Sequence, residues 1–158
     1  MNVKTKEERK TRRETWGFLQ AMRYLERRAG KKPRIGQSRR LSQEVVDMGQ
    51  DPYTGFAYDE LSEVDVNAKR PRVRPRFLGF FGPFGPLPHS ITREVDRWAR
   101  TGDKAFVRFA DIFVARFQQL FYRSWADARP ITQYDRPTGG EFPRLLRALT
   151  GDAPKCVD

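Results

Sequence analysis

The chain has 158 residues, of which 38% are hydrophobic and 13% aromatic, and its formal net charge is +11. This length suits a single domain, and the aromatic content argues against disorder throughout the chain. One His and one Cys, His89 and Cys156, exclude an internal disulfide and a usual zinc site and leave little for nucleophilic catalysis. We therefore expect no bound metal, no cofactor and no enzyme activity, and the single Cys suits a reducing compartment.

The first part of the chain predicts one helix and then short extended segments. Residues 1–14 form a basic leader without the apolar stretch of a signal peptide, and we expect this leader to be flexible. Apolar residues at spacings of three and four predict a helix from Glu14 to Ala29. Residues 31–58 indicate short strands and turns, and an alternating pattern in residues 60–70 indicates a further strand.

Residues 72–78 alternate three arginines with apolar residues. Because Pro75 has no N–H to donate to a ladder, this pattern predicts an edge strand with one basic face. Exposed arginine side chains would suit the phosphates of a nucleic acid or an acidic protein surface. The basic face consists of Arg72, Arg74 and Arg76.

The next segment, FLGFFGPFGPLP at residues 77–88, holds four Phe and no charge. Its glycine spacing resembles a phosphate-binding turn, but Pro83 and Pro86 remove two of the backbone N–H groups that such a turn needs. We therefore expect a rigid bridge between the strand and the helical part. Either all four Phe side chains pack internally, or some of them meet a neighbouring subunit. The longest uncharged run, 77–92, holds three Gly and three Pro and cannot form a membrane-spanning helix.

The second part of the chain predicts three helices. Ser90 or Thr92 can cap the first, which runs to about Arg100. Asp103 can cap the second, a long aromatic-rich helix over about 103–126 that we expect to be covered on more than one side. Residues 129–140 indicate a polar loop, and Phe142–Leu149 a last short helix. The aromatic face of the long helix consists of Phe106, Phe109, Ala110, Phe113, Phe117, Leu120 and Phe121, widened by Val107, Val114 and Trp125.

Three charged residues of the long helix have predicted partners. We expect Asp111 to pair with Arg108 or to contact a neighbouring element. Arg116 and Arg123 are seven residues apart and share a helix face, so we expect at least one to pair with a carboxylate of this chain or of a partner. The alternative is that both are solvated. Together these elements predict an α+β fold, mainly helical with a few short strands.

The Phe-rich loop and the long helix, in this order, resemble TssG, a baseplate subunit of the bacterial type VI secretion system. Members of this family show a similar F-x-G-L-x-G-P-x-G-x-L-P loop and a later F-L-D-L-F-x-H-R-x-x-x-L-F-Y-R-A-W helix. Residues 15–150 resemble the N-terminal domain of the family. TssG proteins are usually longer, so the resemblance implies that the C-terminal half is absent and that residues 151–158 are a tail. The residues that we expect to bind partners or to hold the motifs are Gly79, Phe80, Phe81, Gly82, Pro83, Phe84, Gly85, Pro86, Leu87, Pro88, Asp111, Arg116, Tyr122, Arg123 and Trp125.

The resemblance implies a structural role without catalysis, cofactor or small-molecule substrate. TssG proteins join two copies of TssF in a wedge, contact TssK trimers and lie close to TssE at the sheath end. The implied location is cytoplasmic, in a complex docked at the inner face of the cell envelope, with no insertion into the membrane. The alternative is a small basic nucleic-acid-binding protein, motivated by the net charge of +11 and the three clustered arginines. Against it, no known reader motif is present, and the aromatic residues follow helical spacing.

Overall fold

The computed structural model describes residues 16–30, 32–135 and 140–151. Within these ranges the chain has the predicted α+β fold, with five α-helices, one 3-10 helix and a three-stranded sheet. The predicted leader and nearly all of the predicted tail lie outside the described residues. In chain order the elements are α2 (Phe18–Arg28), η1 (Leu41–Gln43), β1 (Asp47–Met48), β2 (Leu61–Asp65), β3 (Arg72–Pro75), α3 (His89–Arg100), α4 (Ala105–Asp127), α5 (Pro130–Tyr134) and α6 (Glu141–Leu149).

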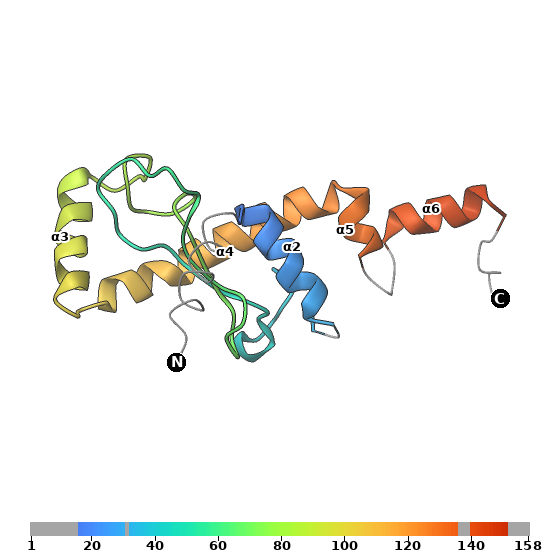
Figure 1. Cartoon of the computed structure of the whole chain (residues 1–158), viewed down its shortest axis with the longest axis horizontal. Helices are drawn as coiled ribbons and strands as arrows, with labels where there is room; N and C mark the ends of the chain where they lie inside the picture. Colours follow the sequence, from blue (N-terminus) through green and yellow to red (C-terminus); the bar gives the residue numbers. More distant parts are fainter. Residues whose placement is uncertain (1–15, 31, 136–139, 152–158) are drawn as a thin grey trace, which may run out of the picture.

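The long helix α4 is the axis of the molecule (Figure 1). Helix α3 stands at the N-terminal end of α4, and α2 lies across its C-terminal half. Helices α5 and α6 continue beyond the C-terminal end, so that α6 lies away from the sheet. No helix in the described part of the chain is long and apolar enough to cross a membrane.

Strand β3 lies in the centre of the sheet, so the prediction of an edge strand is wrong. It pairs in parallel with β1 and antiparallel with β2. The two residues of β1 pair only with Arg72 and Val73. Pro75 is the last residue of β3 and lies beyond this short partner, so its missing N–H does not interrupt the pairing with β1.

The other extended segments are shorter than the sequence indicates. Within residues 31–58 only Asp47–Met48 forms a strand. Val45, Val46 and Met48 are all buried, and such consecutive burial does not fit a regular strand with one exposed face. In β2 the register shifts between Leu61 and Glu63. This bulge allows Leu61 and Val64, three positions apart, to be buried in the same core.

The core consists of two clusters. The main core lies between α2, the sheet and the C-terminal half of α4, and it includes Phe18, Met22, Val73 and Tyr122. The second cluster lies under the Phe-rich loop, α3 and the N-terminal half of α4. Its buried members are Phe81, Val95, Val107 and Ala110.

The predicted helices are confirmed, and of the two expected caps one differs. Neither Ser90 nor Thr92 caps α3, which begins at His89 directly after Pro88. The Asp103 carboxylate does accept the N–H of Ala105 at the start of α4, at 2.9 Å. The start of α2 is held by a residue distant in the chain, because the Phe18 N–H donates at 2.9 Å to the carboxylate of Glu60, which directly precedes β2.

Helix α5 lies where the sequence indicates a loop. Pro130 is its first residue, a position at which proline needs no hydrogen-bond partner and its fixed φ suits a helix. The Thr132 hydroxyl donates to the carbonyl of Arg129 at 2.7 Å and also to that of Ala126. These bonds satisfy carbonyls at the junction of α4 and α5 and so stabilise the turn.

The ion pair between Arg23 and Asp135 joins α2 to the end of α5, with Nε and Oδ2 at 2.5 Å. The hydrogen bond from Arg23 lowers the pKa of Asp135 below its ordinary value of 3.8. A carboxyl whose pKa is lower in the folded chain stabilises the fold above the unfolded-state pKa and loses this contribution as the pH falls through the folded pKa.

We therefore expect Asp135→Asn to show a weaker loss of stability between about pH 5 and pH 3 than the wild type. Urea unfolding at several pH values measures this difference. Asp59→Asn, which changes an exposed carboxylate, is the control and should follow the wild-type profile. Equal pH profiles for Asp135→Asn and the wild type would contradict the prediction.

Candidate protein-binding surface

Helix α4 has two faces, and its phenylalanines lie on the exposed one, whereas Tyr122 lies on the buried one. The prediction that the long helix is covered on more than one side is wrong for the described chain. Six exposed apolar side chains, 38% to 68% exposed, form a row that we call the α4 ridge: Phe106, Phe109, Ile112, Phe113, Phe117 and Leu120. Phe121 is also 42% exposed, but its ring packs against Phe18 and Phe77. The buried face consists of Val107, Ala110, Val114, Gln118, Tyr122 and Ala126, together with Gln119 at its edge.

The size of the side chains explains why this face is the one that packs inside. Val107, Ala110 and Val114 are small, so the Phe-rich loop and the sheet can approach the α4 backbone closely. Larger rings at these positions would hold the neighbouring segments away. The spacing of the Phe residues is helical, as predicted, but it places them on the opposite side of α4.

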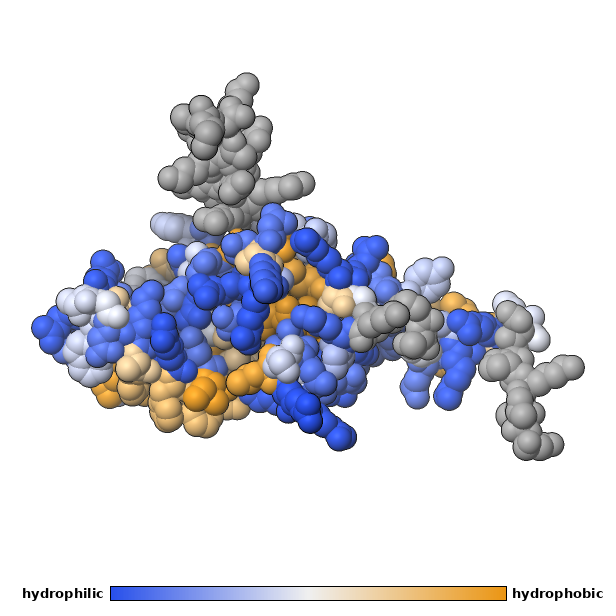
Figure 2. All heavy atoms as spheres, turned by 90° about the horizontal axis from the view of Figure 1, so that it is seen from below, coloured by the Kyte–Doolittle hydropathy of each residue, from blue (hydrophilic) through white to orange (hydrophobic). Residues whose placement is uncertain are grey.

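The ring contacts join the α4 ridge to the Phe-rich loop. The centroids of Phe109 and Phe113 are 5.5 Å apart, and Phe80 of the loop lies 6.4 Å from both Phe113 and Phe117. A band of apolar surface runs along one edge of the molecule over the first half of α4, next to the more polar end that carries α3 (Figure 2). The loop and the helix, which are separate motifs in the sequence, therefore form one surface.

The four Phe residues of the loop have four different surroundings. Phe77 packs against the main core and Phe81 is buried in the second cluster. Phe80 lies on the α4 ridge, while Phe84 is 86% exposed. The arrangement in which all four pack internally is therefore excluded. The ring of Phe84 lies edge-to-face against that of Phe56, itself 78% exposed, with 5.8 Å between the ring centroids, and we call this pair the loop tip.

The buried amide of Gln50 fixes the loop. It donates to the carbonyl of Phe81 at 3.0 Å and accepts the N–H of the same residue at 2.8 Å. Gly79 allows this approach, because a Cβ at this position would lie 2.1 Å from Oε1 of Gln50. Only 1% of Gln50 is exposed, so these two bonds are shielded from water.

Tyr53 holds the other side of the loop. Its hydroxyl donates to the carbonyl of Arg76 at 2.5 Å, and burial raises the pKa of this hydroxyl. Gly82 has a φ of +97°, and a Cβ there would lie 2.3 Å from the Tyr53 ring. The rest of the predicted loop residues complete the turn: Pro83, Gly85, whose N–H donates to Gly82, Pro86, Leu87, which packs against the second cluster, and Pro88, which precedes α3.

Asp111 connects α4 to the sheet, which is the second of the two predicted alternatives. Its carboxylate lies 3.0 Å from Nη2 of Arg74 and accepts the N–H of Gln50 at 2.9 Å. Nε of Arg74 lies 2.8 Å from Asp51. Burial raises the pKa of Asp111, and the bonds from Gln50 and Arg74 counteract this rise.

The arginines of β3 do not form the predicted exposed basic face. Arg74 is 9% exposed and is neutralised by two carboxylates. Arg72 is half-exposed and lies 3.6 Å from Asp47 and 3.9 Å from Glu63. Two of the three clustered arginines that motivated the nucleic-acid alternative are therefore paired with carboxylates of this chain.

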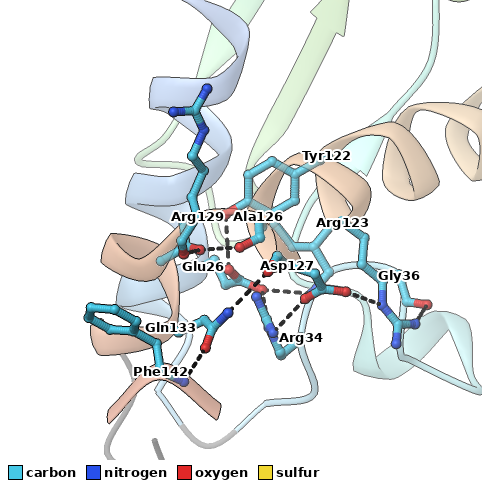
Figure 3. Close-up of polar contacts among 12 residues, drawn as sticks. Glu26, Arg34, Gly36, Tyr122, Arg123, Ala126, Asp127, Arg129, Gln133 and Phe142 are labelled. Atoms are coloured by element: carbon cyan, nitrogen blue, oxygen red, sulfur yellow. Dashed lines mark hydrogen bonds and ion pairs between the residues drawn. The ribbon is translucent and has the colours of Figure 1, made fainter. Parts of the chain in front are cut away.

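A polar network holds the C-terminal end of α4 to α2 and the following segment (Figure 3). The buried Glu26 accepts hydrogen bonds from the Tyr122 hydroxyl at 2.9 Å and from the N–H of Ile35 at 3.2 Å. Arg34 lies 3.4 Å from Glu26 and 2.9 Å from Asp127. The network therefore links three elements through one buried carboxylate.

The prediction that at least one of Arg116 and Arg123 pairs with a carboxylate is confirmed by Arg123. Nε of Arg123 lies 3.5 Å from Asp127, whereas Arg116 donates to the carbonyl of Gly36 at 3.1 Å. Trp125 packs against the main core, with its ring 6.0 Å from that of Tyr122. Most of the helix residues predicted for the site therefore attach α4 to its own chain.

The sequence prediction of the site therefore missed two groups of residues. The prediction recognised the helical spacing of the Phe residues of α4 but did not include the α4 ridge among the site residues. It also missed Gln50, Tyr53 and Glu26, whose partners are distant in the chain and largely backbone groups, so no local pattern indicates them.

Two exposed aromatic surfaces on an internally bonded core are typical of a subunit of a protein assembly. The family model described as "Type VI secretion, TssG" matches residues 13–157. The chain therefore belongs to the TssG family, and is a structural component of the type VI secretion baseplate. No match was found to a curated protein or to a solved structure.

Proposed function

We propose that this chain is a non-catalytic connector of the baseplate that binds TssF-like, TssK-like and TssE-like subunits. The observation that carries the proposal is the pair of exposed aromatic surfaces, the α4 ridge and the loop tip, on a strongly charged protein. Exposed aromatic side chains gathered in one place are typical of protein interfaces. In this proposal residues 15–150 form the binding domain, and the complex stands at the inner face of the cell envelope.

A connector needs at least two separate contact surfaces. The α4 ridge lies on a helix, whereas the loop tip lies where two loops bring Phe56 and Phe84 together. The bonds from Gln50 and Tyr53 hold the Phe-rich loop in place without a partner. Because the loop is already ordered, binding would cost little additional conformational entropy.

The test is co-expression of this chain with the TssF-like and TssK-like subunits of its own system. We expect Phe109→Ser with Phe113→Ser to weaken binding of at least one subunit by roughly 30-fold or more, because truncating a single hot-spot aromatic already costs about 2 kcal/mol. The fold should persist, since these rings are 58% and 45% exposed. Co-purification and titration by calorimetry measure the effect, and thermal unfolding checks the fold.

Leu41→Ser is the matched control, because Leu41 is 78% exposed and belongs to neither surface. Phe84→Ser tests the loop tip separately and should weaken a different subunit if the two surfaces bind different partners. Wild-type binding of every subunit by both the ridge variant and the loop-tip variant would overturn the proposal.

A further inference from the structure

The spacing of the α4 ridge suits a helical partner. Its rings and leucine follow one another at intervals of three, four, four and three residues. This is the spacing of a seam along which a second helix packs at a small crossing angle. At 1.5 Å per residue the seam is about 21 Å long, or about four helical turns. Its members are Phe106, Phe109, Phe113, Phe117 and Leu120.

One side of this seam is cationic. Arg116 lies beside the seam, and Arg108 lies farther round the helix on the same side. Both are exposed, and neither has a carboxylate partner among the described residues. Arg116 donates to the carbonyl of Gly36, so the segment around Gly36 passes this side of α4. The same segment continues to Arg39 and Arg40, which are also exposed and lack a carboxylate partner within the described ranges.

No exposed, unpaired carboxylate of α4 offsets these charges. The acidic residues of α4 are Asp111 and Asp127, and each is already paired, with Arg74 and Arg34 respectively. On the other side of the seam lies the Phe-rich loop, which holds no charge and places Phe80 against the ridge. The seam is therefore bordered by positive charge on one side and by apolar surface on the other.

We propose that the α4 ridge binds an amphipathic α-helix of a partner protein whose apolar stripe is bordered on one side by Asp and Glu residues. This inference rests on the proposed function and adds the chemistry of the segment that is bound. A second copy of this chain does not fit, because two ridges in contact would bring Arg108 and Arg116 against the same residues, and each copy carries a net charge of +11. Acidic residues along one edge would also fix the direction in which the partner helix lies.

Two helix-stapled peptides test this inference. Both peptides are about four helical turns long and carry Leu at the positions that would face the seam. One carries Glu along a single edge, and the other carries Lys at the same places. Fluorescence anisotropy with the full chain should show the Glu peptide binding roughly threefold to tenfold more tightly at low salt, since two exposed ion pairs contribute modestly. The preference should shrink as the salt concentration rises.

The charge-reversed variant Arg108→Glu with Arg116→Glu should bind the Lys peptide in preference, while Phe109→Ser with Phe113→Ser should bind neither. Thermal unfolding checks that both variants fold. Equal binding of the two peptides, or a preference that Arg108→Glu with Arg116→Glu leaves unchanged, would overturn the inference. If neither peptide binds but the ridge variant still loses a baseplate subunit in co-purification, this inference fails and the proposed function stands.

Discussion

Arg74→Met is expected to lower the free energy of unfolding by about 3 kcal/mol, because it leaves the largely buried carboxylate of Asp111 without its cationic partner. Urea unfolding near pH 7 measures the loss. Arg72→Met is the matched control on the same strand. The Arg72 side chain is 50% exposed, so its loss should cost less than about 1 kcal/mol.

The pH dependence of this variant identifies the cause. Arg74 counteracts the raised pKa of Asp111, so its removal should raise that pKa further above the ordinary value of 3.8. A carboxyl whose pKa is higher in the folded chain costs stability as the pH rises through the folded pKa. The deficit of Arg74→Met should therefore be smaller near pH 4 than near pH 7.

The double variant Arg74→Met with Asp111→Asn keeps an acceptor for the N–H of Gln50 but removes the buried charge. It should recover part of the stability that Arg74→Met loses. A deficit of Arg74→Met that is the same at both pH values and in the double variant would contradict this account. Such a result would show that the lost ion pair with Asp111 is not the origin of the stability deficit of Arg74→Met.

Gln50→Ala is expected to cost about 2–5 kcal/mol, because it leaves the N–H and the carbonyl of Phe81 without partners in a buried place. Urea unfolding measures the loss, and amide exchange at Phe81 should become faster. Gln43→Ala is the control, since Gln43 is exposed and its side chain accepts a 3.4 Å bond from the N–H of Arg39.

Gly79→Ala tests the same contact from the other side. Alone it should destabilise the chain, because the new Cβ would meet Oε1 of Gln50. In the Gln50→Ala background that atom is gone, so the cost of Gly79→Ala should be clearly smaller. Additive losses in the double variant would contradict the proposed close contact.

The helices could be predicted from the sequence because their spacing is a local property. The same spacing did not indicate that the Phe side of α4 is exposed. A ring that packs in the core and a ring that packs against a partner leave the same periodic pattern, since both avoid water. The smaller residues Val107, Ala110 and Val114 identify the inner face only when the neighbouring loop is in place.

The sheet was predicted less well for a different reason. The central place of β3 depends on β1, which has two residues and offers almost no pattern. Arg74 lies in the same alternation as two other arginines, and only the tertiary fold distinguishes it, through Asp51 and Asp111. Gln50 likewise acts through backbone groups 31 residues away.

The loop from Phe77 to Phe84 passes through both core clusters and also reaches the surface at Phe80. A ligand that binds at the surface around Phe80 binds the native chain in preference to the unfolded chain. Its binding therefore stabilises both core clusters at once by mass action. Occupancy of this surface should therefore raise the melting temperature of the whole domain. Incorporation into the assembly and resistance to heat would rise together.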